Sequence, residues 1–188
     1  MASRGIKTGR FWSGNYRPFI SQGVDWGIKH PQLTQGEMRT FLKLVRPQMQ
    51  PADVYPISGD CSSFAIALSN VLGPSNTEYV ASFEDEYEYD RGLATHVGVK
   101  YNGRIYDAEG ETTEQRLLNY AREEADDPQT AFVVTTSNES EITMHEDVNP
   151  DEVIGGSCDP RIISKIERIM QKVLKSGVRI GEQNRPGG

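Results

Sequence analysis

The chain has 188 residues, of which 36% are hydrophobic and 25% are charged, which is enough material for one domain with a single hydrophobic core. No apolar run approaches the roughly 18 residues that a membrane-spanning helix needs, and the basic N-terminal segment lacks the apolar stretch of a secretory signal. We therefore expect a cytoplasmic protein that does not bind membranes. Its two cysteines, Cys61 and Cys158, are too few for a disulfide framework or a four-thiolate zinc site.

The net charge of -7 is distributed unevenly along the chain. Basic residues outnumber acidic ones in residues 1–50 and 161–188, whereas residues 51–160 hold most of the carboxylates. An acidic surface disfavours binding to a phosphate backbone. We therefore expect no nucleic-acid partner, and a peptide or protein substrate or partner with positive charge; the oligomeric state stays open.

The chain divides into three parts by pattern. Residues 1–33 lack clear periodicity and predict an irregular N-terminal arm, residues 34–180 predict a single domain, and residues 181–188 predict a flexible tail. Within the domain, Thr34 and Glu37 form a capping box before apolar residues at helical spacing. They predict a helix that ends before Pro47.

A second helix is predicted from about Cys61 to Leu72, after an extended connector over the proline-containing residues 47–58. Apolar residues recur at helical spacing along it, and Gly73 followed by proline ends it. Asp60 is expected to cap this helix, so Cys61 is expected in its first turn.

The next segments predict a sheet. Residues 77–83 predict a strand and residues 84–92 an acidic loop, followed by two strand-like runs, 94–101 and 104–110, which flank Asn102-Gly103. Asn-Gly between two such runs is typical of a two-residue type I′ hairpin turn.

The remaining elements alternate between helix and sheet. We expect a helix to about Glu124, a strand, a polar loop, a final helix whose apolar stripe packs in the core, and a short last strand. Thr112 and Gln115 form a capping box at the start of the first of these helices. The other expected elements are strand 131–136, loop 137–157, helix Asp159–Gly177 with Pro160 in its first turn, and strand 178–180. The order of elements predicts an α+β fold with an antiparallel sheet.

The hairpin brings four residues to one face. A two-residue turn pairs Gly98 with Asp107 and His96 with Glu109, and all four side chains then project to the same side. His96 and Asp107 are diagonal neighbours, about 7–8 Å apart at the backbone, a distance that their side chains can span. Gly98 is expected to leave the space between them open.

Cys61, His96 and Asp107 together could carry nucleophilic chemistry. The N–H groups and dipole at a helix start stabilise a thiolate and can hold an oxyanion. A carboxylate that orients an imidazole makes the base that a thiol nucleophile requires. We therefore interpret Cys61 as the nucleophile, His96 as the base and Asp107 as the orienting residue, with Glu109 as the rival orienter.

These residues resemble a known superfamily over about residues 55–110. The segments GDCSSFAIALSNVLG and THVGVKYNGRIYDAEG resemble the papain-like cysteine peptidase superfamily. DCSSF and HVGVKYNGRIYDA are similar to the NlpC-type cell-wall peptidases, whereas Asp107 with the later Gly110 is more similar to the transglutaminase-like branch. The resemblance implies a papain-like core, in which the helix bearing Cys61 packs on an antiparallel sheet bearing His96 and Asp107.

The chain also departs from the patterns that it resembles. NlpC-type enzymes usually have Pro-Gly-Asp before the histidine strand, where this chain has EDEYEYD. Papain-like enzymes proper have a Gln before the Cys, which completes the oxyanion hole. Here the N–H of Cys61 is one donor, and Gln48, Gln50, Tyr55 or Ser58 is left open as the second.

The combined interpretation is a cysteine hydrolase, a peptidase or amidase that works through an acyl-thioester without a metal or cofactor. Glu109, Ser62 and Tyr55 are expected to bind the substrate. The alternatives are a transglutaminase-like acyltransferase and a non-catalytic protein that binds a basic partner through its acidic face. Cell-wall peptide, protein tail and isopeptide linkage all stay open, and murein would be reached only through a phage or a secretion apparatus.

Other candidates receive simpler interpretations. Cys158 is interpreted as a structural or incidental thiol, His145 as a solvated loop histidine and His30 as a turn residue. Tyr87 and Tyr89 are interpreted as parts of a solvated loop, with docking of a basic substrate as the alternative.

Overall fold

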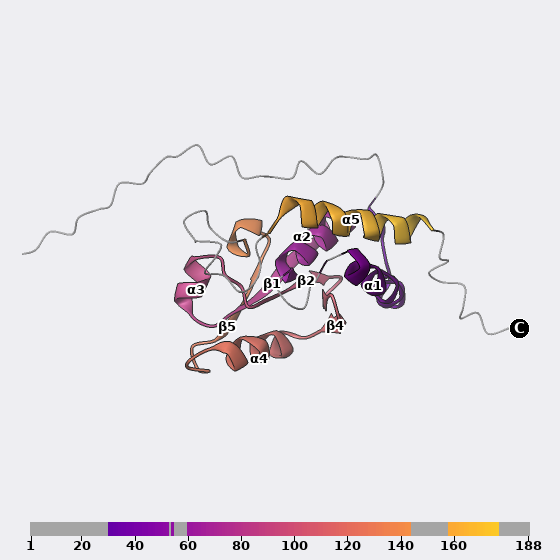
Figure 1. Cartoon of the computed structure of the whole chain (residues 1–188). Helices are drawn as coiled ribbons and strands as arrows, with labels where there is room; N and C mark the ends of the chain where they lie inside the picture. The colour runs from indigo at the N-terminus through magenta and orange to yellow at the C-terminus, as the bar shows by residue number, and fades with distance from the viewer. Residues whose placement is uncertain (1–29, 53, 55–59, 144–157, 177–188) are drawn as a thin grey trace, which may run out of the picture.

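A computed structural model describes residues 30–52, 54, 60–143 and 158–176 (Figure 1). It contains a five-stranded sheet in the order β4-β3-β2-β1-β5, in which every neighbouring pair is antiparallel. The strands are β1 (Thr77–Phe83), β2 (His96–Tyr101), β3 (Arg104–Asp107), β4 (Gly110–Thr112) and β5 (Phe132–Thr136). The predicted α+β class with an antiparallel sheet is confirmed.

Helices cover both faces of the sheet. Three of them, α1, α2 and α5, lie together on one face, and α4 packs on the other face against β1, β2 and β5 (Figure 1). The helices are α1 (Gln35–Met49), α2 (Cys61–Leu72), α3 (Glu86–Asp90), α4 (Glu114–Glu124) and α5 (Pro160–Lys175), with 3₁₀ turns at Gln50–Ala52, Pro74–Asn76 and Glu139–Glu141. None of the helices within the described ranges is both long and apolar enough to cross a membrane.

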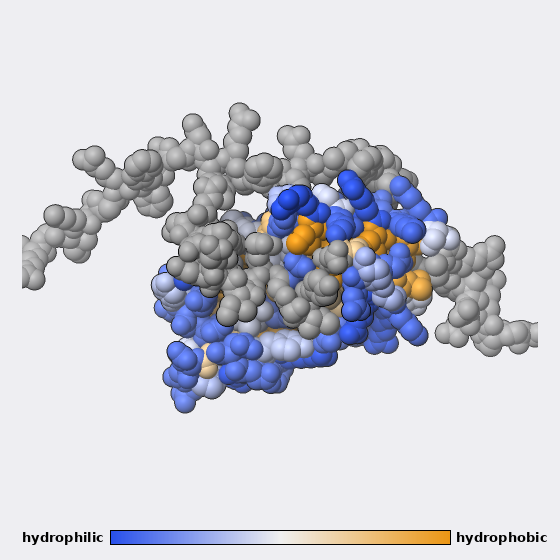
Figure 2. All heavy atoms as spheres, in the orientation of Figure 1, coloured by the Kyte–Doolittle hydropathy of each residue, from blue (hydrophilic) through white to orange (hydrophobic). Residues whose placement is uncertain are grey.

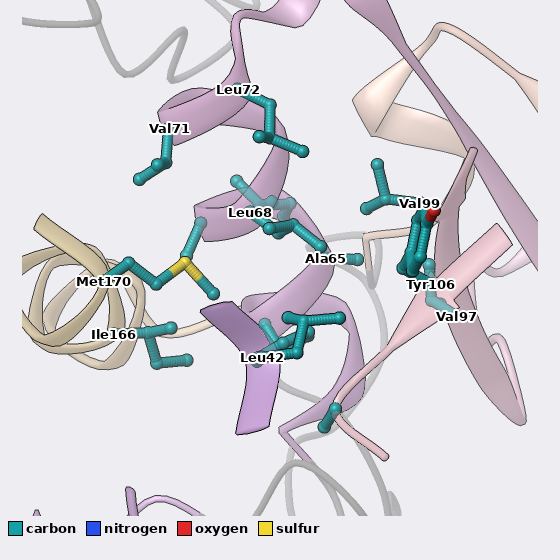
Figure 3. Close-up of a cluster of buried hydrophobic side chains, with 14 of the residues drawn as sticks. Leu42, Ala65, Leu68, Val71, Leu72, Val97, Val99, Tyr106, Ile166 and Met170 are labelled. Atoms are coloured by element: carbon teal, nitrogen blue, oxygen red, sulfur yellow. The ribbon is translucent and has the colours of Figure 1, made fainter. Parts of the chain in front are cut away.

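Helix α2 forms the centre of the main core. Figure 3 shows it between Ile166 and Met170 of α5 on one side and the sheet residues Val97 and Val99 on the other. Of its residues, all but Asn70 are buried. A helix with apolar neighbours on opposite sides needs apolar or small residues around most of its circumference, which explains the sequence CSSFAIALSNVL.

Helix α5 covers α2 from outside. Its central residues are buried, which confirms the predicted core packing of its apolar stripe. Other apolar side chains of the helix are only half-buried: Ile162, Ile163, Ile169 and Leu174. Figure 2 shows hydrophobic side chains at the surface over α5. Asp159 caps the helix as predicted, since its carboxylate accepts the N–H of Arg161 at 2.8 Å.

The predicted hairpin is confirmed in turn and register. Asn102 and Gly103 have φ angles of 50° and 75°, the left-handed values that a type I′ turn requires. Tyr101 pairs with Arg104, and the register continues to Val99 opposite Tyr106.

The prediction was wrong about the residues after Asp107. Strand β3 ends at Asp107, and a turn over Ala108 and Glu109 leads into β4, so Glu109 does not lie opposite His96. The carboxylate of Asp107 accepts the N–H groups of Glu109 and Gly110, which is a side-chain-stabilised turn. Gly110 has a φ of 130°, a value that L-residues rarely adopt.

Helix α1 continues through Pro47, where it was predicted to end. A proline removes one backbone hydrogen bond, but Val45 and Met49 on either side of it are buried in the core. Their burial holds the last turn in place. The capping box of Thr34 and Glu37 is present as predicted.

Two further boundaries differ from prediction. The acidic segment 84–92 contains the short helix α3, capped by Asp85, because Tyr89 packs edge-on against Phe83 of the core. Thr113, not Thr112, caps α4, since Thr112 is the buried last residue of β4.

The first described residues pack against the domain. Leu33 is buried, and its N–H donates to the hydroxyl of Tyr101 at 3.0 Å. The predicted arm over residues 1–29, most of the 137–157 loop, the last strand and the tail lie outside the described residues.

Candidate active site

His96 and Asp107 form a buried pair on neighbouring strands. His96 is the first residue of β2 and Asp107 the last of β3, and His96 Nε2 lies 3.2 Å from Asp107 Oδ2. The side chains are 9% and 2% exposed, respectively. The diagonal contact predicted from the hairpin register is therefore present.

The carboxylate of Asp107 is fixed by its own turn. While Oδ2 faces His96, Oδ1 accepts the N–H of Glu109 at 2.8 Å and of Gly110 at 3.1 Å. Both oxygens of the carboxylate are therefore engaged, and its orientation toward the imidazole follows from the fold of the β3–β4 turn.

Gly98 does not leave the open space that we expected between these two residues. A Cβ atom at Gly98 would lie 2.9 Å from Ile105 Cγ2 and 3.2 Å from the carbonyl oxygen of Tyr106. Glycine is instead required because β2 and the Ile105 side chain of β3 approach closely at this point.

Cys61 is the first residue of α2, as predicted, and is buried. Asp60 precedes it at the N-cap position, and its carbonyl, not its carboxylate, accepts the hydrogen bond that begins the helix, from the N–H of Phe64 at 2.8 Å. The Cys61 side chain lies close enough to His96 to raise the pKa of the imidazole. The structure thus brings Cys61, His96 and Asp107 together.

The surroundings of His96 favour its charged form. Burial acts to lower the pKa of the imidazole, but the hydrogen bonds and charges of Asp107 and Cys61 outweigh it and raise the pKa from 6.5 to about 9. His96 is therefore mainly protonated at neutral pH. The ring of Tyr120, from α4, lies against the imidazole with 4.8 Å between the ring centroids.

The Glu109 side chain contacts residues of α4 and α1 and does not face His96. Its carboxylate is bound by Arg116, accepts the hydroxyl of Tyr120 at 3.2 Å and lies 3.8 Å from Arg46. The contact with His96 is made by Asp107, so the rival assignment of Glu109 as the orienter is wrong. Its link to the pair is its main-chain N–H, which donates to Asp107.

Ser62 and Cys158 lie beside Cys61. Both Ser62 and Cys61 belong to the first turn of α2, and both lie close enough to Cys158 to affect the pKa of its thiol. Burial, followed by the nearby charges of Cys61 and Glu139, raises the pKa of Cys158 from 9.0 to about 12. Sequence reasoning tied nothing to Cys158, because a contact between such distant positions of the chain leaves no local pattern.

The other candidates lie apart from this cluster or outside the described residues. His30 Nδ1 is 3.3 Å from the carbonyl oxygen of Val71, at the opposite end of α2 from Cys61. Gln48 donates to the carbonyl of Leu44 at 3.0 Å, within its own helix. Tyr55, Ser58 and His145 lie outside the described residues.

Sequence reasoning missed Tyr120 and Arg116 as neighbours of the site. They lie one turn apart on α4, a spacing that places both side chains on the same helix face. Their four-residue spacing could be recognised in the sequence. Nothing in the sequence showed that this face of α4 meets the β3–β4 turn.

Within the described part of the chain, no group of three or more histidine, cysteine or acidic side chains is arranged to hold a metal ion. The chain matches no protein-family model. Comparison with curated proteins and comparison with solved structures also give no match.

Proposed function

We propose that this protein is a cysteine hydrolase, a peptidase or amidase with a papain-like arrangement of Cys61, His96 and Asp107. One observation carries the proposal: the imidazole of His96 is held between the Cys61 side chain at a helix start and the carboxylate of Asp107. A nucleophile, a base and a group that orients the base are the three parts of a covalent hydrolytic site.

The proposed mechanism gives each ring nitrogen of His96 its own role. Nε2 of His96 faces Asp107, so Nδ1 is the nitrogen that exchanges a proton with Cys61. The sulfur attacks the carbonyl carbon of the substrate, and the carbonyl electron pair moves to oxygen. N–H groups at the start of α2 stabilise this oxyanion.

Collapse of the tetrahedral intermediate breaks the carbon–nitrogen bond. The leaving amine takes a proton from His96, and the acyl group stays on Cys61 as a thioester. His96 then accepts a proton from water, which attacks the thioester carbon. The carbon–sulfur bond breaks to release the acid, and His96 returns the proton to the Cys61 sulfur. A raised pKa of His96 supports its role as the proton donor to the amine.

The acidic residues that come after β1 support a substrate with positive charge. Ser82 pairs with His96 in the sheet, so the residues after Phe83 leave the sheet at the end where the site lies. There, burial and the charges of nearby carboxylates raise the pKa of Glu84; the neighbours are Glu88, Glu124, Asp85 and Asp126. Clustered carboxylates attract a basic ligand, and salt weakens the attraction.

Turnover of a peptide library by the full chain tests the proposal. We expect Cys61→Ala and His96→Ala to abolish hydrolysis, and Cys158→Ala, the matched cysteine control, to retain it. Basic peptides should be cleaved with a higher kcat/KM than acidic ones, and the difference should shrink with salt. Hydrolysis by a folded Cys61→Ala variant would contradict the proposal.

Burial of the site favours a second candidate, acyl transfer to an amine as in transglutaminase-like enzymes. Cys61 and His96 are both buried, and a thioester shielded from water survives longer to meet another acceptor. Supplying a primary amine with the acyl donor separates the two reactions, because transfer yields the new amide and hydrolysis yields the free acid. A chain that forms no adduct with any donor would instead favour the non-catalytic alternative, an interaction protein that binds a basic partner.

A further inference from the structure

Tyr120 connects α4 to both members of the His96–Asp107 pair. Its ring lies against the imidazole of His96, with centroids 4.8 Å apart and planes inclined by 46°. Its hydroxyl donates to Glu109 Oε2 at 3.2 Å and accepts from Arg116 Nη2 at 3.1 Å. Arg116 also binds the same oxygen of Glu109, so two α4 residues hold one carboxylate.

These contacts form a closed ring of interactions around the His96–Asp107 pair, which we call the circuit. From Tyr120 the chain of bonds passes to the carboxylate of Glu109, and the N–H of Glu109 donates to Asp107 Oδ1 at 2.8 Å. Asp107 Oδ2 then meets His96 Nε2, and the imidazole returns to the ring of Tyr120. Helix α4 therefore contacts the imidazole directly and Asp107 through the turn that orients it.

We propose that Tyr120 is a positioning residue of this site, which holds the imidazole between Cys61 and Asp107; the role rests on the proposed hydrolase function. The torsion that turns a histidine ring is broad, so the bond to Asp107 alone leaves the ring free to rock. An aromatic ring packed against it narrows that motion. It also keeps water away from the Nε2 to Oδ2 bond, which is stronger in a dry environment.

A positioning role for Tyr120 differs from simple packing in its effect on the pKa of His96. Among the described residues, the titratable groups that face the imidazole are Cys61 from α2, Asp107 from β3 and Tyr120 from α4. If Tyr120 were only filler, its removal would relieve burial, which raises the pKa of His96 or leaves it unchanged. If Tyr120 positions the ring, its removal weakens the bonds to Asp107 and Cys61, and the pKa of His96 falls.

NMR titration of histidine-labelled full-length protein measures this without requiring catalysis. A His96→Gln spectrum assigns the His96 signal. We expect Tyr120→Leu to lower the titration midpoint by about one pH unit, a tenfold change in proton affinity. Tyr120→Phe keeps the ring and should stay close to the wild type. Tyr87→Leu, at a tyrosine that is 63% exposed, is the control and should change nothing.

A kinetic measurement completes the test. For the hydrolytic reaction, Tyr120→Leu should lower kcat about tenfold with little change in KM, as expected when an acid–base group is misaligned. Tyr120→Phe should keep most of the wild-type kcat.

A titration midpoint of His96 in Tyr120→Leu that is unchanged or higher overturns the role of Tyr120. If that variant does not fold, Glu109→Gln replaces it, since it weakens the same circuit and should also lower the midpoint; an unchanged midpoint there overturns the role equally. Absence of turnover in the wild type overturns the hydrolase function, whatever the titration shows.

Discussion

His96 Nε2 lies 3.2 Å from Asp107 Oδ2, and this contact joins the beginning of β2 to the end of β3. Because the contact favours the charged imidazole, it makes the stability of the fold depend on pH. The folded-state pKa of His96, about 9, lies above its ordinary value of 6.5. The stabilisation is therefore complete below pH 6.5 and is lost as pH rises through 9.

Asp107→Asn tests this dependence. We expect it to lower the free energy of unfolding by roughly 1.5–3 kcal/mol at pH 6, the range for a hydrogen bond to a charged group, and by less at pH 10. Urea unfolding at the two pH values measures the difference. In a His96→Gln background the effect of Asp107→Asn should no longer vary with pH, and equal losses at pH 6 and pH 10 in the wild-type background would contradict the account.

The two cysteines should differ in how folding affects their alkylation. Burial raises the pKa of Cys158 from 9.0 to about 12, so at pH 8 its thiolate is about 1000-fold scarcer in the folded protein than in urea. Iodoacetamide followed by peptide mapping should show Cys158 strongly protected in the native state and modified rapidly in the denatured state. Similar rates of Cys158 modification in both states would contradict the raised pKa of this half-buried thiol.

Gly98→Ala should destabilise the hairpin. Its new methyl group would meet Ile105 Cγ2 at 2.9 Å and the Tyr106 carbonyl at 3.2 Å, and overpacking of this kind costs about 1–3 kcal/mol. Thermal or urea unfolding measures the loss. Gly36→Ala is the matched control, since a Cβ there meets no atom within 4 Å in helix α1, and it should leave stability unchanged or increase it. A Gly98→Ala variant as stable as the wild type would contradict the close approach of the strands.

Glu111 should contribute to stability in a manner that acid removes. Hydrogen bonds from Gln35 and Arg104, together with Arg39, lower the pKa of its carboxylate from 4.5 to about 2. Because the folded pKa is lowered, the contribution is present above pH 4.5 and is lost as pH falls through 2. Unfolding curves should show Glu111→Gln less stable than the wild type at pH 6, with a difference that shrinks toward pH 2. A difference as large at pH 2 as at pH 6 would point to packing as its source.

The sequence was sufficient where the signals are local. Helix α2 begins at Cys61 and ends at Leu72 as predicted, because Gly73-Pro74 terminates it and its apolar spacing is regular. Asn102-Gly103 determined both the turn and the register of the hairpin, and the register alone placed His96 beside Asp107.

Local signals failed where tertiary contacts decide the conformation. Burial of Met49 carries α1 past Pro47, and the hydrogen bonds that Asp107 accepts from its own turn end β3 before Glu109 can pair with His96. Tyr120 and Cys158 lie beside the site although they belong to distant parts of the chain. No spacing in the sequence predicts these tertiary contacts.

The central claim is that Cys61 is a nucleophile and that His96 exchanges a proton with it. Detection of an acyl group on Cys61 tests this claim most directly. Full-length protein would be mixed with a panel of amide and activated-ester acyl donors, quenched in acid, and analysed by intact mass and peptide mapping. We predict a thioester on Cys61 that hydroxylamine removes. The same thioester should form far more slowly in the His96→Ala variant. Acylation confined to Cys158, or equal acylation of Cys61 in the wild type and in His96→Ala, would contradict the claim.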